Sequence, residues 1–140
     1  IRSYYLARAL ADRGIATVVI TAHNGPKKTD DVEGIVVHYL PVAYDNRFDF
    51  WKRLVSFWRF LWLGTREAKS VHGVDYYYAI STPLTVGLMA RWLKRTTGVP
   101  YLFEVGDLWP EAPIQLGYIQ NAWLKKWLYR LERSIYREAQ

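Results

Sequence analysis

Three carboxylates lie within one eight-residue stretch of the sequence, together with a glycine and a Trp-Pro pair. The relevant residues are Glu104, Gly106, Asp107, Trp109 and Glu111. Carboxylates in such a cluster can orient sugar hydroxyls or act as a general base, and an indole ring can stack on a sugar face. The alternative is structural: Asp107 would cap a turn, Glu111 would begin a helix, and Trp109 would belong to the core. The spacing alone leaves both interpretations open.

A second candidate site is the segment Ser81-Thr82-Pro83, which precedes a predicted helix. The free backbone N–H groups and the positive dipole end of a helix favour phosphate or sugar oxygens, and the two hydroxyls could add to such a site. Ser and Thr also lead at helix N-caps where no ligand binds. Residue preferences at helix N-termini therefore favour ordinary capping, and Ser81 and Thr82 are kept as candidate substrate-binding residues.

Both candidate sites follow predicted strands. The hydrophobic pattern predicts strands over residues 15–22, 34–42, 74–80 and 101–105, helices over 1–13, about 49–70, 83–97 and 122–140, and loops over 23–33 and 106–121. Strands and helices in this order predict an α/β fold with a mainly parallel sheet and helices on both faces. Ligands of such sheets bind beyond the carboxyl ends of the strands, which is where both candidate sites lie.

The composition is typical of a single globular domain spanning residues 1–140. Of the 140 residues 51% are apolar and none is Cys, which excludes a disordered chain and a disulfide-stapled scaffold. No uncharged apolar run is long enough to span a bilayer. His23, His38 and His72 are too scattered to predict a metal site. The chain opens inside a predicted helix and ends on one without a terminator, so we expect truncation at both ends and a missing first strand.

The predicted helix over residues 49–70 is both basic and aromatic. A helical projection places Lys52, Arg53, Ser56, Arg59 and Arg66 on one side, and Phe50, Leu54, Phe57, Trp58, Leu61 and Trp62 on the other. Trp favours the headgroup layer of a membrane and cations are attracted to an anionic leaflet, so the helix suits peripheral membrane binding. The alternative is an outer helix that covers the sheet. The residues expected to face a membrane are Trp51, Lys52, Trp58, Arg59 and Trp62.

Nucleic acid is the other class of partner that a basic, aromatic surface could bind. The net charge of +6 is concentrated in residues 47–69 and 121–140, and both local excesses are modest beside those of proteins that contact many phosphates. The sequence also contains no recognisable nucleic-acid module. We therefore expect no nucleic-acid partner.

Three segments resemble the N-terminal Rossmann-like domain of the family 4 GT-B glycosyltransferases. Residues 2–22 (RSYYLARALADRGIATVVITA) are similar to that family's first helix and second strand, and residues 80–105 (ISTPLTVGLMARWLKRTTGVPYLFEV) to the stretch from its fourth to its fifth strand. Residues 106–117 (GDLWPEAPIQLG) are similar to its Asp-Leu-Trp-Pro-Glu segment, in the branch that builds polyprenyl-linked saccharides and exopolysaccharides. Gly106 is a departure, because relatives usually carry Arg there, or His in other branches.

The resemblance implies that residues 1–140 are the acceptor-side half of a retaining, hexosyltransferase-type glycosyltransferase, without its C-terminal donor domain. Its substrates would be a nucleotide-sugar donor, with no further cofactor, and a lipid-linked or polysaccharide acceptor at the cytoplasmic face of the membrane. Asp107 is the expected catalytic residue. The expected substrate-binding residues are Ser81, Thr82, Glu104, Gly106, Trp109 and Glu111. We expect the chain alone to be inactive; the alternative is a non-catalytic Rossmann-like binding module.

Overall fold

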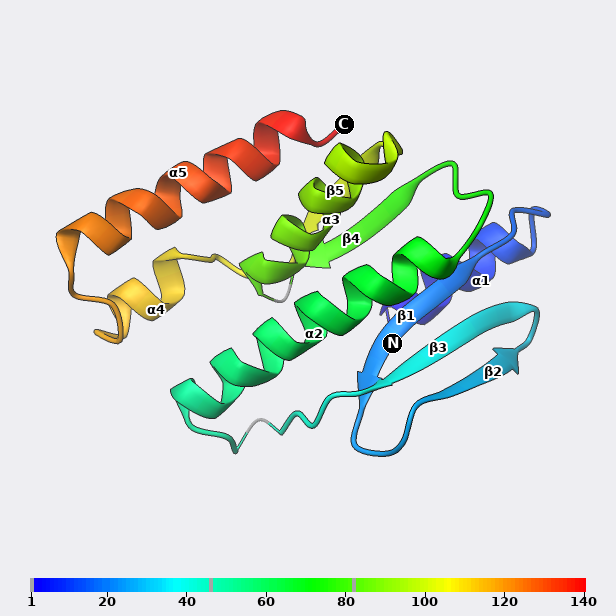
Figure 1. The fold of residues 1–140 in the computed structure, drawn as a ribbon, viewed down its shortest axis with the longest axis horizontal. Helices are drawn as coiled ribbons and strands as arrows, with labels where there is room; N and C mark the ends of the chain where they lie inside the picture. The colour runs from blue at the N-terminus through cyan, green and yellow to red at the C-terminus, as the bar shows by residue number, and fades with distance from the viewer. Residues whose placement is uncertain (1, 46, 82) are drawn as a thin grey trace. The chain divides into compact units, whose positions relative to one another are not determined.

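The computed structural model describes residues 2–45, 47–81 and 83–140, and the chain divides into two compact units. The first unit is Ile1–Ala68 and the second is Lys69–Gln140. Figure 1 shows the helices and strands of both units. Thr82, one of the predicted site residues, lies outside the described residues.

The first unit is built on a three-stranded sheet in which β3 lies between β1 and β2 (Figure 1). Its elements are α1 (Arg2–Ala11), β1 (Val18–His23), β2 (Lys28–Val32), β3 (Ile35–Pro41) and α2 (Phe50–Ser70). β1 pairs with β3 in parallel. The small core of this sheet consists of Ala7 from α1 and of Ile35 and Val37 from β3.

The strand β2 is a difference from the sequence-based expectation, which placed a loop over residues 23–33. It pairs antiparallel with β3 through the turn at Glu33 and Gly34, which both have positive φ angles, 54° and 83°. Two consecutive positive φ values are what a tight hairpin turn requires, and Gly34 adopts such a value without steric cost. The segment Lys28–Val32 is rich in charge and poor in strand-forming side chains, so its own sequence gives no strand signal.

The second unit contains a two-stranded parallel sheet with helices packed on it (Figure 1). Its elements are β4 (Tyr77–Ser81), α3 (Leu84–Thr97), β5 (Tyr101–Val105), α4 (Glu111–Gln115) and α5 (Ala122–Glu138). α3 packs on both strands and also against α5. Its C-cap is Gly98, with a φ of 78°, where the sequence predicts the end of the helix. The short α4 begins at Glu111, as the structural interpretation of the carboxylate cluster expects, within a segment otherwise predicted to be a loop.

The core of the second unit is formed by Ala79, Leu84, Ala90, Tyr101 and Ile135. The fully buried hydroxyl of Tyr101 donates a hydrogen bond to the carbonyl oxygen of Ile135 at 2.6 Å, which joins β5 to α5. Burial raises the pKa of Tyr101 to about 12.

Gly87 lies where α3 approaches its neighbours most closely. A Cβ atom at this position would lie 2.7 Å from the ring of Phe103 on β5 and 2.8 Å from a methyl group of Ile135 on α5. Because real Cβ atoms do not approach other atoms so closely, only glycine allows α3 to pack at this distance from both elements.

The α/β class with parallel strand pairs is confirmed, but the arrangement of the sheets differs in part from the prediction. The strands of the described residues form two separate sheets, and one of these is mixed because of the antiparallel β2. The four expected helices, α1, α2, α3 and α5, and the four expected strands all lie within a few residues of their predicted positions.

Candidate functional site

The two candidate segments leave the second sheet at the same end. β4 and β5 are parallel, and Ser81, the last residue of β4, is paired in register with Val105, the last residue of β5. The segment after Val105 therefore begins beside the segment that follows Ser81, at the carboxyl edge where ligands of such sheets bind. Ser81 itself is buried, with 2% of its surface exposed, so its hydroxyl lies beneath this edge.

Asp107 is the carboxylate most available to a ligand at this edge. It is exposed, and its backbone carbonyl, not its side chain, accepts the hydrogen bond from the Trp109 N–H at 2.9 Å. The Asp107 carboxylate makes no hydrogen bond or ion pair with any residue that the structure describes. The structure therefore gives no capping contact to this side chain.

Glu111, by contrast, is engaged within the protein. It begins α4, and its carboxylate accepts hydrogen bonds from the Tyr129 hydroxyl on α5 and, at 2.5 Å, from the side-chain amide of Gln115. These hydrogen bonds, above all that from Tyr129, lower the pKa of Glu111. Its main visible role is to join α4 to α5.

The remaining predicted residues around Asp107 have different surroundings. Glu104 is half-buried on β5, and its carboxylate accepts a 2.5 Å hydrogen bond from the Tyr78 hydroxyl on β4. Trp109 packs against the core of the second unit, which is the placement that the structural interpretation predicts. Gly106 is exposed and adds no side chain where relatives of the resembled family carry one.

Sequence reasoning missed Tyr78 and Tyr129, the two hydroxyl donors to the carboxylates of this region. Each lies far from its partner in the sequence, and nothing in the local pattern indicates the contact. Two leucines near the site, Leu108 and Leu116, are also unusually exposed, at 72% and 71%. Apolar side chains this exposed are candidates for contact with a lipid or another apolar partner.

The exposed face of α2 carries a row of apolar side chains, which we call the aromatic row. It consists of Trp51, Val55, Trp58 and Trp62. Intervals of four, three and four residues align these side chains along one face of the helix. Trp51 and Trp62 are 71% and 63% exposed. Lys52, Arg59 and Arg66 are exposed beside the row.

This placement corrects the predicted division of α2 into a basic and an apolar side. Ser56, expected on the basic side, is buried and its hydroxyl donates a 2.7 Å hydrogen bond to the carbonyl of Ala43. Trp58 and Trp62, which the helical projection placed on the side opposite the cations, lie on the exposed face beside the cations. The inward side of the helix is the one that carries its buried residues, Ser56, Gly64, Glu67 and Ala68.

The C-terminal part of α2 is attached to the first sheet through Glu67. Its carboxylate accepts hydrogen bonds from the Lys27 ammonium and from Nδ1 of His38, both at 2.6 Å. These partners, Lys27 first, lower the pKa of Glu67. Among residues 2–45, 47–81 and 83–140, no group of three or more His, Asp or Glu side chains is placed to hold a metal ion.

Comparison with known proteins shows the family of this chain. The glycosyl transferase 4-like domain family matches residues 1–140. The chain belongs to this family. No curated protein and no solved structure gives a significant match.

Membership of the glycosyl transferase 4-like family assigns the chain a glycosyltransferase-type role. A domain of this family takes part in binding a sugar donor and an acceptor. The family match confirms the resemblance seen in the sequence and agrees with the Rossmann-like α/β class. Within the described part of this domain, no helix is long and apolar enough to cross a membrane.

Proposed function

We propose that this glycosyl transferase 4-like domain is the acceptor-side half of a retaining, hexosyltransferase-type enzyme. Its substrates would be a nucleotide-sugar donor and a lipid-linked or polysaccharide acceptor of the cell envelope. The observation that carries the proposal is the exposed Asp107 carboxylate, without a partner among the described residues, at the carboxyl edge of β5.

The chemical role of Asp107 follows from its surroundings. A carboxylate at this edge can accept a hydrogen bond from an acceptor hydroxyl and take its proton as the hydroxyl oxygen bonds to the anomeric carbon of the donor sugar. The bond from that carbon to the nucleotide phosphate breaks in the same transfer, and the nucleotide leaves with the electron pair. Glu111 and Glu104 are less suited to this role, because Tyr129 and Tyr78 already donate hydrogen bonds to them. Asp107 is therefore the catalytic residue that we propose, with the others supporting the shape of the edge.

The second part of the proposal is peripheral binding of α2 to the inner face of the cytoplasmic membrane. The aromatic row places Trp side chains where the headgroup layer of a bilayer would receive them, and the neighbouring cations complement anionic lipid. Lys52 and Arg59 are exposed beside this row. Such an orientation would bring a lipid-linked acceptor close to the domain.

The test of the proposed catalytic residue is Asp107→Asn in the full-length enzyme. We expect kcat/KM to fall at least tenfold, equivalent to about 1.4 kcal/mol, because the amide can neither accept the proton nor carry the charge. Asp75→Asn is the matched control, since Asp75 is an exposed carboxylate before β4. Urea denaturation of both variants checks that folding is unchanged. An unchanged rate for Asp107→Asn would assign Asp107 a structural role at the turn and overturn its role as the catalytic residue.

A further inference from the structure

The exposed face of α5 carries a second row of side chains, which we call the basic row. It consists of Lys126, Arg130, Arg133 and Arg137. Their intervals of four, three and four residues align them along one face of the helix. All four are exposed, and none forms an ion pair or a side-chain hydrogen bond with a residue in the described part of the chain.

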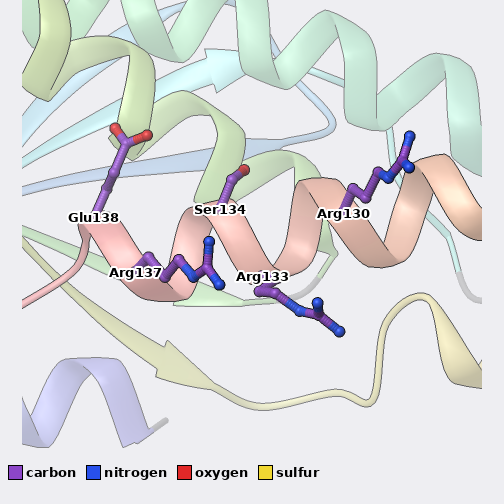
Figure 2. A pocket seen from close by; sticks show the side chains of 5 residues that line it. All are labelled: Arg130, Arg133, Ser134, Arg137 and Glu138. Carbon is purple, nitrogen blue, oxygen red and sulfur yellow. The ribbon is translucent and has the colours of Figure 1, made fainter.

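The two carboxylates of α5 do not neutralise this row, and the first of them, Glu132, accepts a hydrogen bond from the Tyr136 hydroxyl at 2.9 Å. Glu138 accepts hydrogen bonds from Nε of Arg91 at 2.8 Å and from the Arg95 guanidinium at 2.7 Å, both on α3. Figure 2 shows the Glu138 side chain pointing away from the guanidinium groups of Arg133 and Arg137. The positive charge of the basic row is therefore open to an external partner.

The geometry of the row indicates an extended anionic surface rather than one small anion. The hollow of about 450 Å³ on α5 is lined by residues of this helix alone. Figure 2 shows the guanidinium groups of Arg130, Arg133 and Arg137 spread along the helix and not converging on a point. A single phosphate is held by donors that converge, whereas a row of roughly 16 Å, at 1.5 Å per residue, can contact several headgroups at once.

Two tryptophans beside the basic row identify the kind of surface. Trp123 and Trp127 lie near the N-terminal end of α5 and are 83% and 52% exposed. Indole rings of this kind favour the headgroup layer of a bilayer, and a helix with Trp beside a cationic face is typical of those that lie in the membrane interface. A soluble acidic polymer offers no apolar layer that would accept these rings.

We propose that α5 lies on an anionic lipid surface, with the basic row facing phosphate headgroups and Trp123 and Trp127 entering the interface. This contact belongs to the second unit and does not depend on the proposed contact of α2. The charge of the row contributes the attraction and the two indoles fix the depth of the helix.

The first experiment is sedimentation with phosphatidylcholine vesicles that contain phosphatidylglycerol. We expect Arg130→Glu with Arg133→Glu to lower the vesicle partition coefficient at least tenfold at low salt. The matched control is Arg13→Glu with Arg47→Glu, which changes the net charge equally at exposed positions outside the row. Equal losses in the two double variants would overturn the proposal, because net charge alone would then explain binding.

The second experiment reports on α5 directly. The chain contains no Cys, so Trp123→Cys gives a single site for an environment-sensitive fluorophore, and Asp75→Cys gives an exposed control site. Anionic vesicles should shift the emission to the blue at position 123 and leave it unchanged at position 75. An unshifted label at 123, or loss of heparin binding in the α5 double variant with vesicle binding intact, would overturn the proposal.

The two membrane contacts can fail separately in these experiments. Vesicle binding that survives Lys52→Glu with Arg59→Glu but is lost with Arg130→Glu and Arg133→Glu would refute the α2 contact and support that of α5. The reverse result would refute the α5 contact and leave the α2 proposal standing.

Discussion

The exposed faces of α2 and α5 use the same two kinds of side chain in opposite arrangements. On α2 the continuous row is apolar and the cations lie beside it, whereas on α5 the continuous row is cationic and two tryptophans lie beside it. Salt screens exposed charges beyond about 8 Å at physiological ionic strength but does not weaken apolar insertion. Two helices of similar composition should therefore respond differently to salt.

The inward faces of the two helices differ as well. α2 is attached through polar contacts, from Ser56 to the Ala43 carbonyl and from Glu67 to Lys27 and His38. α5 also has polar attachments, from Tyr101 to the Ile135 carbonyl and from Arg91 and Arg95 to Glu138, but its inward face adds the fully buried Ile135 to the apolar core of its unit. The comparison shows that the exposed pattern of an amphipathic helix does not determine how its other face is held.

The largest expected effect tests this difference in attachment. Ile135→Ala should lower the free energy of unfolding by about 2 to 5 kcal/mol, because it opens a cavity between α3, β5 and α5. Ser56→Ala should lower it by only about 1 kcal/mol, the net value of one hydrogen bond. Urea denaturation of both variants measures the two losses. Equal losses would show that α5 is not held mainly by apolar packing.

A smaller effect is expected from the α2 surface. Lys52→Glu with Arg59→Glu should remove about 2 kcal/mol of binding to anionic vesicles at low salt, at about 1 kcal/mol for each cation. Trp58→Ala should instead reduce the binding that remains at high salt. Sedimentation across a salt series separates these terms. If Trp58→Ala only destabilises the fold, the helix covers the protein and does not contact lipid.

The smallest effect is expected in the acid dependence of stability, through Glu67 on α2 and Glu138 on α5, which help to attach these helices. The folded-state pKa of Glu67, held low by Lys27 and His38, lies below the ordinary value of 4.5. Its pairing therefore stabilises the fold above about pH 4.5, and this contribution is lost as the pH falls through the lower folded pKa.

Glu67→Gln should remove about 1 kcal/mol of this acid-dependent stability. The pKa of Glu138 is also lowered, first by Arg95, so its pairing should likewise contribute stability that is lost in acid. This contribution should be smaller than that of Glu67, because water screens the more exposed pairing of Glu138. Unfolding curves between pH 6 and pH 3 measure both. An acid limb that is identical in the wild type and in Glu67→Gln would contradict the assignment.

Most of the fold could be predicted because its elements carry strong local signals. The strand over residues 101–105 and the start of α5 at Ala122 lie where the pattern places them, and Gly98 ends α3 as expected. β2 could not be predicted in the same way, because its pairing with β3 comes from the hairpin turn at Gly34 and not from its own side chains. Tertiary pairing there outweighs local propensity.

The sequence could predict where the candidate site lies, but not which of its side chains already form hydrogen bonds within the protein. The carboxyl ends of parallel strands coincide by geometry, so the sequence could place Asp107 near Ser81. It could not show that Tyr129 engages Glu111, since those residues are joined only by the packing of α5 beside α4. The faces of α2 were misassigned for a similar reason, because helical periodicity gives angles between residues but not the direction of the core.

Gly87 offers a position from which the carboxyl edge of the second sheet could be altered by engineering. It is a spacer, since the gap between α3 and both Phe103 and Ile135 is set by the absence of a single methyl group. Any larger residue would force α3, the Phe103 ring or Ile135 to shift. A shift of α3 would carry with it Pro83 at the start of that helix, only two positions after Ser81. Position 87 is therefore a remote adjustment point for the width of the carboxyl edge, available without touching any residue on that edge.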